Sequence, residues 1–226
     1  MSAKTYTSAV DRLKELPEVF TGTDLNMVFG WTSGISSTYL ANWRRAGLVR
    51  SLGGRSDVHM NRVVNPKVNP ETALRRAYPQ SVKVGVDILR EAGWTTQIPT
   101  RPEVAVPQSG PVYSVEDFDL VARSDAWFER VRPGMENAPA AIARLRPAWA
   151  LADMIARAQD RRVRSPWLLD PQDIDLEAAA ADKDMEKALA AFGLDPQCFS
   201  PDGYADLYDG LQMRPHPRDE ITGSSS

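Results

Sequence analysis

The sequence predicts an α+β protein, in which helices and short strands occupy different stretches of the chain. With 226 residues, 42% of them hydrophobic and 25% charged, it has the composition of a globular protein with room for two domains. Residues 20–62 show a helix, a turn, a helix and a hairpin in succession. Residues 71–208 show helices, then short strands, then helices again. We expect an N-terminal domain of residues 1–65, an α+β domain of residues 66–212 with a small, mostly antiparallel sheet, and a disordered tail of residues 213–226.

Two short helices are expected at the start of the chain. The first ends at Pro17, because proline removes a helical hydrogen bond, and its apolar face consists of Ala9, Val10, Leu13 and Leu16. The second begins with Thr23 as its predicted N-cap, and its apolar positions are Leu25, Val28 and Phe29. Together with the helix that follows, they would complete a three-helix core.

The third helix is expected from Ile35 to Ala46, with a Ser or Thr cap before it and Gly47 ending it. At about 100° per residue, one narrow apolar sector should face the core. That sector consists of Ile35, Tyr39, Trp43 and Ala46, with Leu40 at its edge. The opposite sector has small and hydroxyl-bearing residues near its start and arginines near its end.

Two strands follow, over residues 48–52 and 58–62, joined by Gly53-Gly54-Arg55-Ser56. Helix, tight turn, helix and hairpin together are the layout of a winged helix-turn-helix, which can place its second helix in the major groove of DNA. We expect the DNA-contacting face of this helix to consist of Ser33, Gly34, Ser37, Thr38 and Ala41, with base contacts from the three hydroxyls. Phosphate contacts are expected from Arg44, Arg45, Arg50, Arg55 and Arg62.

The charge distribution favours DNA over a domain used only for protein contact. Residues 1–80 carry 11 lysines and arginines against 6 carboxylates, a charge of +5, whereas residues 165–226 carry 4 against 13, a charge of −9. Between Ala41 and Arg62 there are five arginines and one aspartate, although the whole chain has a net charge of −3. A local basic surface on an acidic protein is typical of a nucleic-acid footprint.

The second domain is expected to begin after the proline-rich connector of residues 65–70. Its expected strands are residues 103–107, 111–115, 118–123 and 126–131. Helices are expected before them, at residues 71–78 and, capped by Ser81, 81–93, and after them, at residues 147–158, 182–192 and 202–208.

Short motifs in both domains carry a family resemblance. In the first domain, the helix-turn-helix continues into Leu40-x-x-Trp43-x-x-Ala46-Gly47-Leu48-Val49. In the second, Ala92-Gly93-Trp94-Thr95-Thr96-Gln97-Ile98-Pro99 is similar to an H-G-L-T-x-Q-x-P stretch, with Ala92 and Trp94 at its His and Leu positions. Farther on, Pro147-x-x-Ala150-Leu151-x-Asp153 is similar to a P-x-x-A-L-x-D segment. In these motifs the chain resembles the AbiEi-like family, the antitoxins of the AbiE abortive-infection systems, which are type IV toxin–antitoxin systems.

The resemblance implies a bacterial DNA-binding antitoxin that represses its own operon. It implies a partner as well, a nucleotidyltransferase toxin encoded in the same operon. The second domain would have a nucleotidyltransferase-like topology without the activity. Binding to operator repeats, with self-association on DNA, is a further expectation.

An enzyme is the main alternative. Asp117-Phe118-Asp119 and Asp173-Ile174-Asp175 both have a spacing that can place two carboxylates on one face of a strand to hold a divalent metal. A nucleotidyltransferase also needs a Gly-Ser element at a helix start to hold the triphosphate, and the nearest candidate, Ser109-Gly110, has the reverse order. We therefore expect no catalytic residue and no enzyme, with a nucleotidyltransferase-like site at Asp117 and Asp119 or a protein-binding adaptor as the open alternatives.

No metal site or cofactor is expected. The two histidines, His59 and His216, are far apart in the sequence, and the single cysteine, Cys198, excludes an internal disulfide. No apolar run reaches the length of a membrane span, and the first residues lack the apolar segment of a signal peptide. The expected location is the cytoplasm, without a membrane partner.

Overall fold

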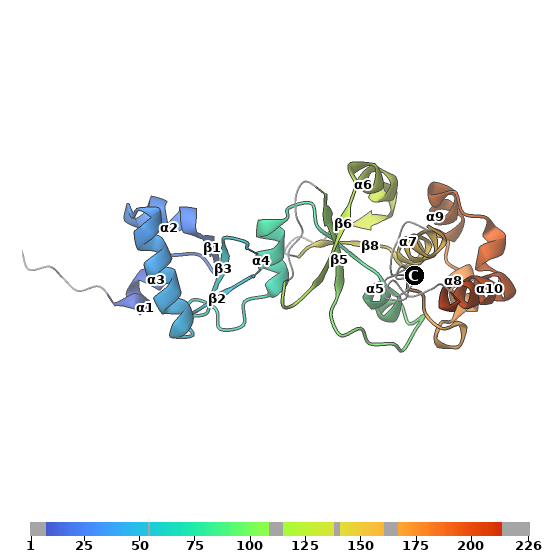
Figure 1. Cartoon of the computed structure of the whole chain (residues 1–226), viewed down its shortest axis with the longest axis horizontal. Helices are drawn as coiled ribbons and strands as arrows, with labels where there is room; N and C mark the ends of the chain where they lie inside the picture. The colour runs from blue at the N-terminus through green and yellow to red at the C-terminus, as the bar shows by residue number, and fades with distance from the viewer. Residues whose placement is uncertain (1–7, 54, 109–114, 138–140, 161–166, 214–226) are drawn as a thin grey trace, which may run out of the picture. The chain divides into compact units, whose positions relative to one another are not determined.

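The computed structural model describes residues 8–53, 55–108, 115–137, 141–160 and 167–213, and it confirms an α+β protein (Figure 1). These residues form ten α-helices and two sheets, of three and five strands. The internal contacts divide the chain into two compact units. The described residues of the first unit lie within 1–81, 105–122 and 137–143, and those of the second within 82–104, 123–136 and 144–226. The domain boundary expected near residue 65 stays a prediction.

The first unit begins with helices and a three-stranded antiparallel sheet. Its elements are α1 (Ala9–Lys14), β1 (Val19–Thr21), α2 (Gly22–Phe29), α3 (Ser33–Arg45), β2 (Val49–Ser51), β3 (Val58–Asn61) and α4 (Pro70–Ala77). The strand order is β1-β3-β2. Met60 of the central strand β3 pairs with Val19 of β1 on one side and with Arg50 of β2 on the other. The three helices and the hairpin expected from the sequence are confirmed, whereas β1 was not predicted.

The core of this unit joins the helices to the sheet. Its buried side chains are Leu13, Leu16, Phe20, Leu25, Leu40, Trp43 and Val49. One buried polar side chain ties the two layers together, because Asn61 Nδ2 donates to the backbone oxygen of Leu13 at 2.7 Å. A buried amide is tolerated only when its hydrogen bonds are made. Asn61 therefore fixes the end of α1 against β3.

The start of α2 differs from the prediction, because its N-cap is Thr21 and not Thr23. The Thr21 hydroxyl accepts from Asp24 N at 3.2 Å, and the Asp24 carboxylate accepts from Thr21 N at 2.7 Å, which together make a capping box. Both threonines precede the same apolar face, but only Thr21 has an acidic residue three positions later. That spacing was the signal for the correct cap.

Helix α4 packs against β3 and β1. Asn69 caps it, Pro70 occupies its first turn, and its Ala73 and Leu74 side chains are fully buried. Arg76 lies 3.6 Å from the Asp24 carboxylate of the capping box. The sheet is thus covered by a helix that follows the expected connector.

The second sheet has the strand order β6-β5-β4-β8-β7. Its strands are β4 (Val82–Val84), β5 (Glu103–Pro107), β6 (Asp119–Arg123), β7 (Met135–Glu136) and β8 (Ala143–Leu145). The helices of the second unit are α5 (Val86–Glu91), α6 (Asp125–Val131), α7 (Pro147–Gln159), α8 (Leu176–Ala180), α9 (Met185–Phe192) and α10 (Pro201–Gln212). The short 3₁₀ segments are η1 (Arg132–Gly134), η2 (Pro171–Asp173) and η3 (Pro196–Phe199). Helix α7 is the centre of this unit and packs against α5, α9 and α10.

Two predictions for the second domain were wrong. The helix expected over residues 81–93 is a strand, β4, followed by a short helix, α5, because Gly85 between them has a φ of 77°, which no helix interior allows. The strand expected at residues 126–131 is the helix α6, whose N-cap Ser124 accepts from Trp127 N at 3.3 Å. Its two buried residues, Trp127 and Val131, are four apart, which is a helical spacing.

The remaining expectations for the second domain either are confirmed or lie outside the described residues. The strand at residues 103–107 and the helices at residues 71–78, 147–158, 182–192 and 202–208 are confirmed within a few residues. Most of the strand expected at 111–115, and residues 214–226 of the expected tail, lie outside the described residues. None of the helices in the described ranges is long and apolar enough to cross a membrane.

Candidate nucleic-acid interface

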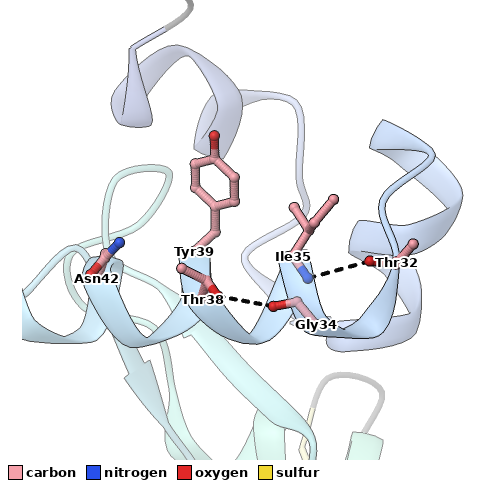
Figure 2. A pocket seen from close by; sticks show the side chains of 6 residues that line it. All are labelled: Thr32, Gly34, Ile35, Thr38, Tyr39 and Asn42. Atoms are coloured by element: carbon pink, nitrogen blue, oxygen red, sulfur yellow. Dashed lines mark hydrogen bonds between the residues drawn. The ribbon is translucent and has the colours of Figure 1, made fainter.

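The orientation of α3 decides which of its residues can meet a ligand. Thr32 caps the helix and accepts from Ile35 N at 3.5 Å (Figure 2). The residues of α3 that are buried are Ser36, Leu40 and Trp43, spaced four and three apart. Ser36 donates its hydroxyl hydrogen to Asn26 Oδ1 of α2 at 2.7 Å, so this small polar residue belongs to the contact between the two helices.

The inward sector predicted for α3 was therefore partly wrong. Trp43 and Leu40 are buried as expected, but Ile35 is 45% exposed and Ala46 is exposed as well. Tyr39 lies half-buried at the rim, stacked on Trp31 at 4.2 Å between ring centroids. Taking about 100° per residue, the buried face of α3 lies about 70° around the helix axis from the face that was predicted to be buried. Counting apolar residues alone missed Ser36, whose burial depends on a partner in α2.

Most of the predicted DNA-contacting residues of α3 are nevertheless on its surface. Exposed positions are Ser33, Gly34, Ser37, Thr38, Arg44 and Arg45, and Ala41 is half-buried. The hydroxyl of Ser37 donates to Ser33 O at 2.8 Å, and that of Thr38 donates to Gly34 O at 3.0 Å. Both hydroxyls keep lone pairs that can accept a hydrogen bond, but in this arrangement their hydrogens are used within the helix.

The hairpin brings further basic residues to the same unit. Arg55 is exposed in the turn between β2 and β3 and has a φ of 59°, a left-handed conformation that costs a non-glycine residue roughly 1 kcal/mol or more. Arg62 is exposed directly after β3, where its backbone N–H donates to Leu48 O at 3.0 Å. A strained conformation in a turn requires support from the surrounding residues or from function.

An open cleft of about 510 Å³ lies between α3 and the hairpin. From α3 it is lined by Ser37, Leu40 and Arg44, and from the hairpin by Ser51, Gly53, Arg55, Ser56, Asp57 and His59. Arginines from both elements therefore border one concave surface. Two positive charges on the walls of a cleft attract an anion more strongly than the same charges on a convex surface, since low-dielectric walls concentrate the field.

His59 lies in this cleft with a mostly buried imidazole, tilted against Phe20 at 5.6 Å between ring centroids. Burial lowers the pKa of His59 below its usual value, the Asp57 carboxylate opposes the shift, and Arg44 adds to it. Asp57 also accepts from the backbone N–H of Gly22 at 2.9 Å, so the one carboxylate of the hairpin is engaged at the start of α2.

Arg50 has a different environment from the other four arginines. Its Nη2 donates to the Asp117 carboxylate at 2.8 Å and lies 3.2 Å from Glu116. The adjacent Val115 is buried and bridges backbone to backbone with Gly53 of the hairpin turn. Hydrogen bonding to Asp117 raises the pKa of Arg50, so the arginine is charged but already neutralised by its partners. A DNA phosphate would have to compete with two carboxylates for it.

The carboxylates of the enzyme alternative have structural partners. Asp117 binds Arg50, and Asp119 is exposed on β6. Asp173 accepts from Gln97 Nε2 at 2.8 Å, and Asp175 caps α8. Among the residues that the structure describes, no group of three or more His, Cys, Asp or Glu side chains could hold a metal ion. Ser109 and Gly110 lie outside the described residues.

Two residues near this surface were missing from the sequence prediction. Asn42 is exposed on α3, and Glu116 is 83% exposed beside Arg50. A helical wheel centred on Ser36, Leu40 and Trp43 would have placed Asn42 on the outer face. No local pattern predicts the pairing of Arg50 with residues 66 and 67 positions away.

Comparison with known proteins finds no protein-family model that matches this chain, and no match among curated proteins.

Proposed function

We propose that this protein is a sequence-specific DNA-binding regulator. In this proposal, the unit built from α1, α2, α3 and the three-stranded sheet is a winged helix-turn-helix, with α3 in the major groove and the β2–β3 turn beside it. The observation that carries the proposal is the cleft between α3 and the hairpin, with Arg44 on one side and Arg55 on the other.

The charges around that cleft support a polyanion as the ligand. Helix α3 contains no acidic residue, and both of its arginines lie in the last turn. Asp57, the one carboxylate lining the cleft, accepts a hydrogen bond from Gly22 N. Two exposed arginines extend the basic surface: Arg55 in the hairpin turn and Arg62 directly after β3. A basic groove of this kind fits the phosphates that flank a base-reading helix.

The exposed face of α3 supports insertion into a groove. A Cβ placed on Gly34 would have no neighbour within 4 Å, so nothing in the described structure hinders close approach there. Ser33, Ser37 and Thr38 are short, and the bulkier arginines come only at the end of the helix. The first turns of a recognition helix are the part that usually contacts base edges.

The biological role in this proposal follows from the resemblance to AbiEi-like antitoxins. The protein would repress its own operon by binding repeated operator sites, as an antitoxin to a nucleotidyltransferase toxin encoded beside it. The second domain, a nucleotidyltransferase-like fold without activity in this proposal, would supply contacts to partners or to further copies on DNA. The proposed partner is the toxin protein that a neighbouring gene would encode.

Binding of the full chain to the DNA upstream of its own gene tests the proposal. We expect fluorescence anisotropy to show an affinity that falls with salt, because each phosphate contact that forms releases a condensed counterion, and this release is less favourable at high salt. The Arg55→Ala variant should bind specific and non-specific duplexes more weakly and lower the slope of log K against log salt by about one unit. Arg132→Ala, at an exposed arginine of η1 in the second unit, is the matched control and should bind like the parent.

Two results would contradict the proposal. The parent could show no salt-dependent affinity for any duplex, which would favour the protein-binding adaptor. Alternatively, Arg55→Ala and Arg132→Ala could change the slope equally, which would mean that the hairpin is not part of the DNA surface.

A further inference from the structure

The orientation of α3 changes which residues form the centre of its outer face. Taking Ser36, Leu40 and Trp43 as the buried side and about 100° per residue, the outermost positions are Thr38 and Arg45. Gly34 and Asn42 lie on either side of these two. Ser37 and Arg44 are displaced toward the hairpin, where they line the cleft described above. Asn42 therefore lies on the outer face, next to its centre, although the predicted DNA-contacting face did not include it.

Asn42 borders a second hollow, of about 620 Å³, on the exposed side of α3. Its lining residues are Thr32, Gly34, Ile35, Thr38, Tyr39 and Asn42, and Figure 2 shows Ile35 and Tyr39 projecting together from the helix above the others. Gly34 contributes no side chain, and the Thr38 hydroxyl donates to Gly34 O at 3.0 Å. The amide of Asn42 is the side chain in this lining that can donate and accept through two separate atoms, which a bidentate contact with a base requires.

A neighbouring arginine orients that amide. Arg45 Nη1 donates to Asn42 Oδ1 at 3.2 Å, which places the oxygen on the arginine side and leaves the amide nitrogen with two hydrogens to donate. The oxygen has a second lone pair, so it can accept another hydrogen bond while Arg45 remains in place. The pair is held one helical turn apart on the same face, a spacing at which side chains of a helix interact.

We propose that Asn42 reads an adenine base in the major groove, with Nδ2 donating to N7 and Oδ1 accepting from the N6 amino group. This pairing of a carboxamide with adenine is bidentate and distinguishes adenine from the other three bases at that position. Arg45 is the positioning residue that fixes the amide orientation. The inference rests on the proposed DNA-binding function and adds the residue and the base that give it sequence preference.

Selection of binding sites from a random double-stranded DNA library tests the inference on the full chain. The parent should select a site that contains an adenine at one position where Asn42→Ala loses the preference. On the parent's site, Asn42→Ala should bind between about fivefold and about 150-fold more weakly, and on a non-specific duplex it should bind within about twofold of the parent. Gln212→Ala, which removes an exposed carboxamide from α10, is the matched control and should select the parent's site.

A second variant separates base reading from side-chain volume. Asn42→Asp keeps the size of the side chain but cannot donate to N7, so it should lose the adenine preference as Asn42→Ala does. If either variant still selects the parent's site with the same adenine, the assignment of Asn42 is overturned while the DNA-binding proposal stands. If the parent selects no sequence, both are overturned. Circular dichroism of each variant should match the parent, because Asn42 is exposed.

Discussion

Replacement of Asp117 by asparagine tests whether the acidic segment beside the hairpin limits DNA binding. In the protein, Asp117 and Glu116 hold Arg50, which lies on β2 within the proposed DNA-binding unit. Asparagine has nearly the same shape as aspartate but no charge. Asp117→Asn should therefore release the Arg50 guanidinium without removing the side chain that packs there.

The expected magnitude follows from the exposure of the pair. The two side chains are 27% and 25% exposed, so the pair lies between an exposed ion pair, worth up to about 1 kcal/mol, and a charge-assisted hydrogen bond, worth about 1.5–3 kcal/mol. We expect a coupling of roughly 1–2 kcal/mol in stability. Glu116 is 83% exposed, and its contact with Arg50 should contribute little. On DNA, one additional available arginine should steepen the salt dependence by about 0.9 in log K against log salt.

A double-mutant cycle measures both effects. Asp117→Asn, Arg50→Met and the combined variant are compared by urea unfolding and by anisotropy on a non-specific duplex at several salt concentrations. Asp119→Asn, at an exposed position two residues farther along, provides the matched charge control. We expect tighter binding and a steeper slope for Asp117→Asn alone.

Two outcomes would refute the reasoning. The slope of Asp117→Asn could equal that of the parent, which would mean that Arg50 does not reach DNA even when released. The gain could also persist in the Arg50→Met background, in which case it would come from the loss of a nearby negative charge and not from the arginine.

Two further predictions concern stability. Asp153→Ala should lower the free energy of unfolding by about 3–5 kcal/mol in a urea titration. In the protein, the buried Arg123 guanidinium lies 2.6 Å from the Asp153 carboxylate, and the variant leaves it without that partner. The control Asp206→Ala, at an exposed site, should change the free energy of unfolding by less than about 0.5 kcal/mol. The pKa of His59 is lowered in the folded protein, so the unfolded chain binds a proton at this histidine more readily. The contribution of neutral His59 to the free energy of unfolding is therefore fully present above about pH 6.5 and declines as the pH falls below that value. The difference in unfolding free energy between pH 7.5 and pH 5.5 should be smaller in His59→Phe, and an equal difference in both proteins would contradict the assignment.

The positions of most elements could be predicted from the sequence because their signals are local. Helix α3 begins at a capping threonine and ends before Gly47, which has a φ of 72°, and the hairpin follows from alternating residues around a glycine pair. The rotation of α3 could not be predicted in the same way. It depends on Ser36 donating to Asn26, and a hydrogen bond between two helices leaves no periodic pattern in either.

Errors in the second domain have a local origin instead. Residues 126–131 were expected to form a strand, and the signal that decides for helix is the Ser124 cap. Gly85 interrupts an apolar run that would otherwise continue as one helix. At both sites a single polar or glycine residue overrides the apolar pattern, because backbone geometry and hydrogen bonding are decided residue by residue.

The five arginines that the sequence groups together occupy four different environments. Arg44 and Arg55 line the cleft, Arg45 orients Asn42, Arg62 is exposed beyond β3, and Arg50 is held by carboxylates. A charge count treats all five alike, yet the electrostatic contribution of each to DNA binding depends on which partner it must leave. Because Arg50 must first give up Asp117, we expect it to add less to the proposed DNA binding than it would without that carboxylate. In the proposed function, the carboxylates of Glu116 and Asp117 would reduce the positive charge that the hairpin offers to DNA, and a count of the hairpin residues does not include them.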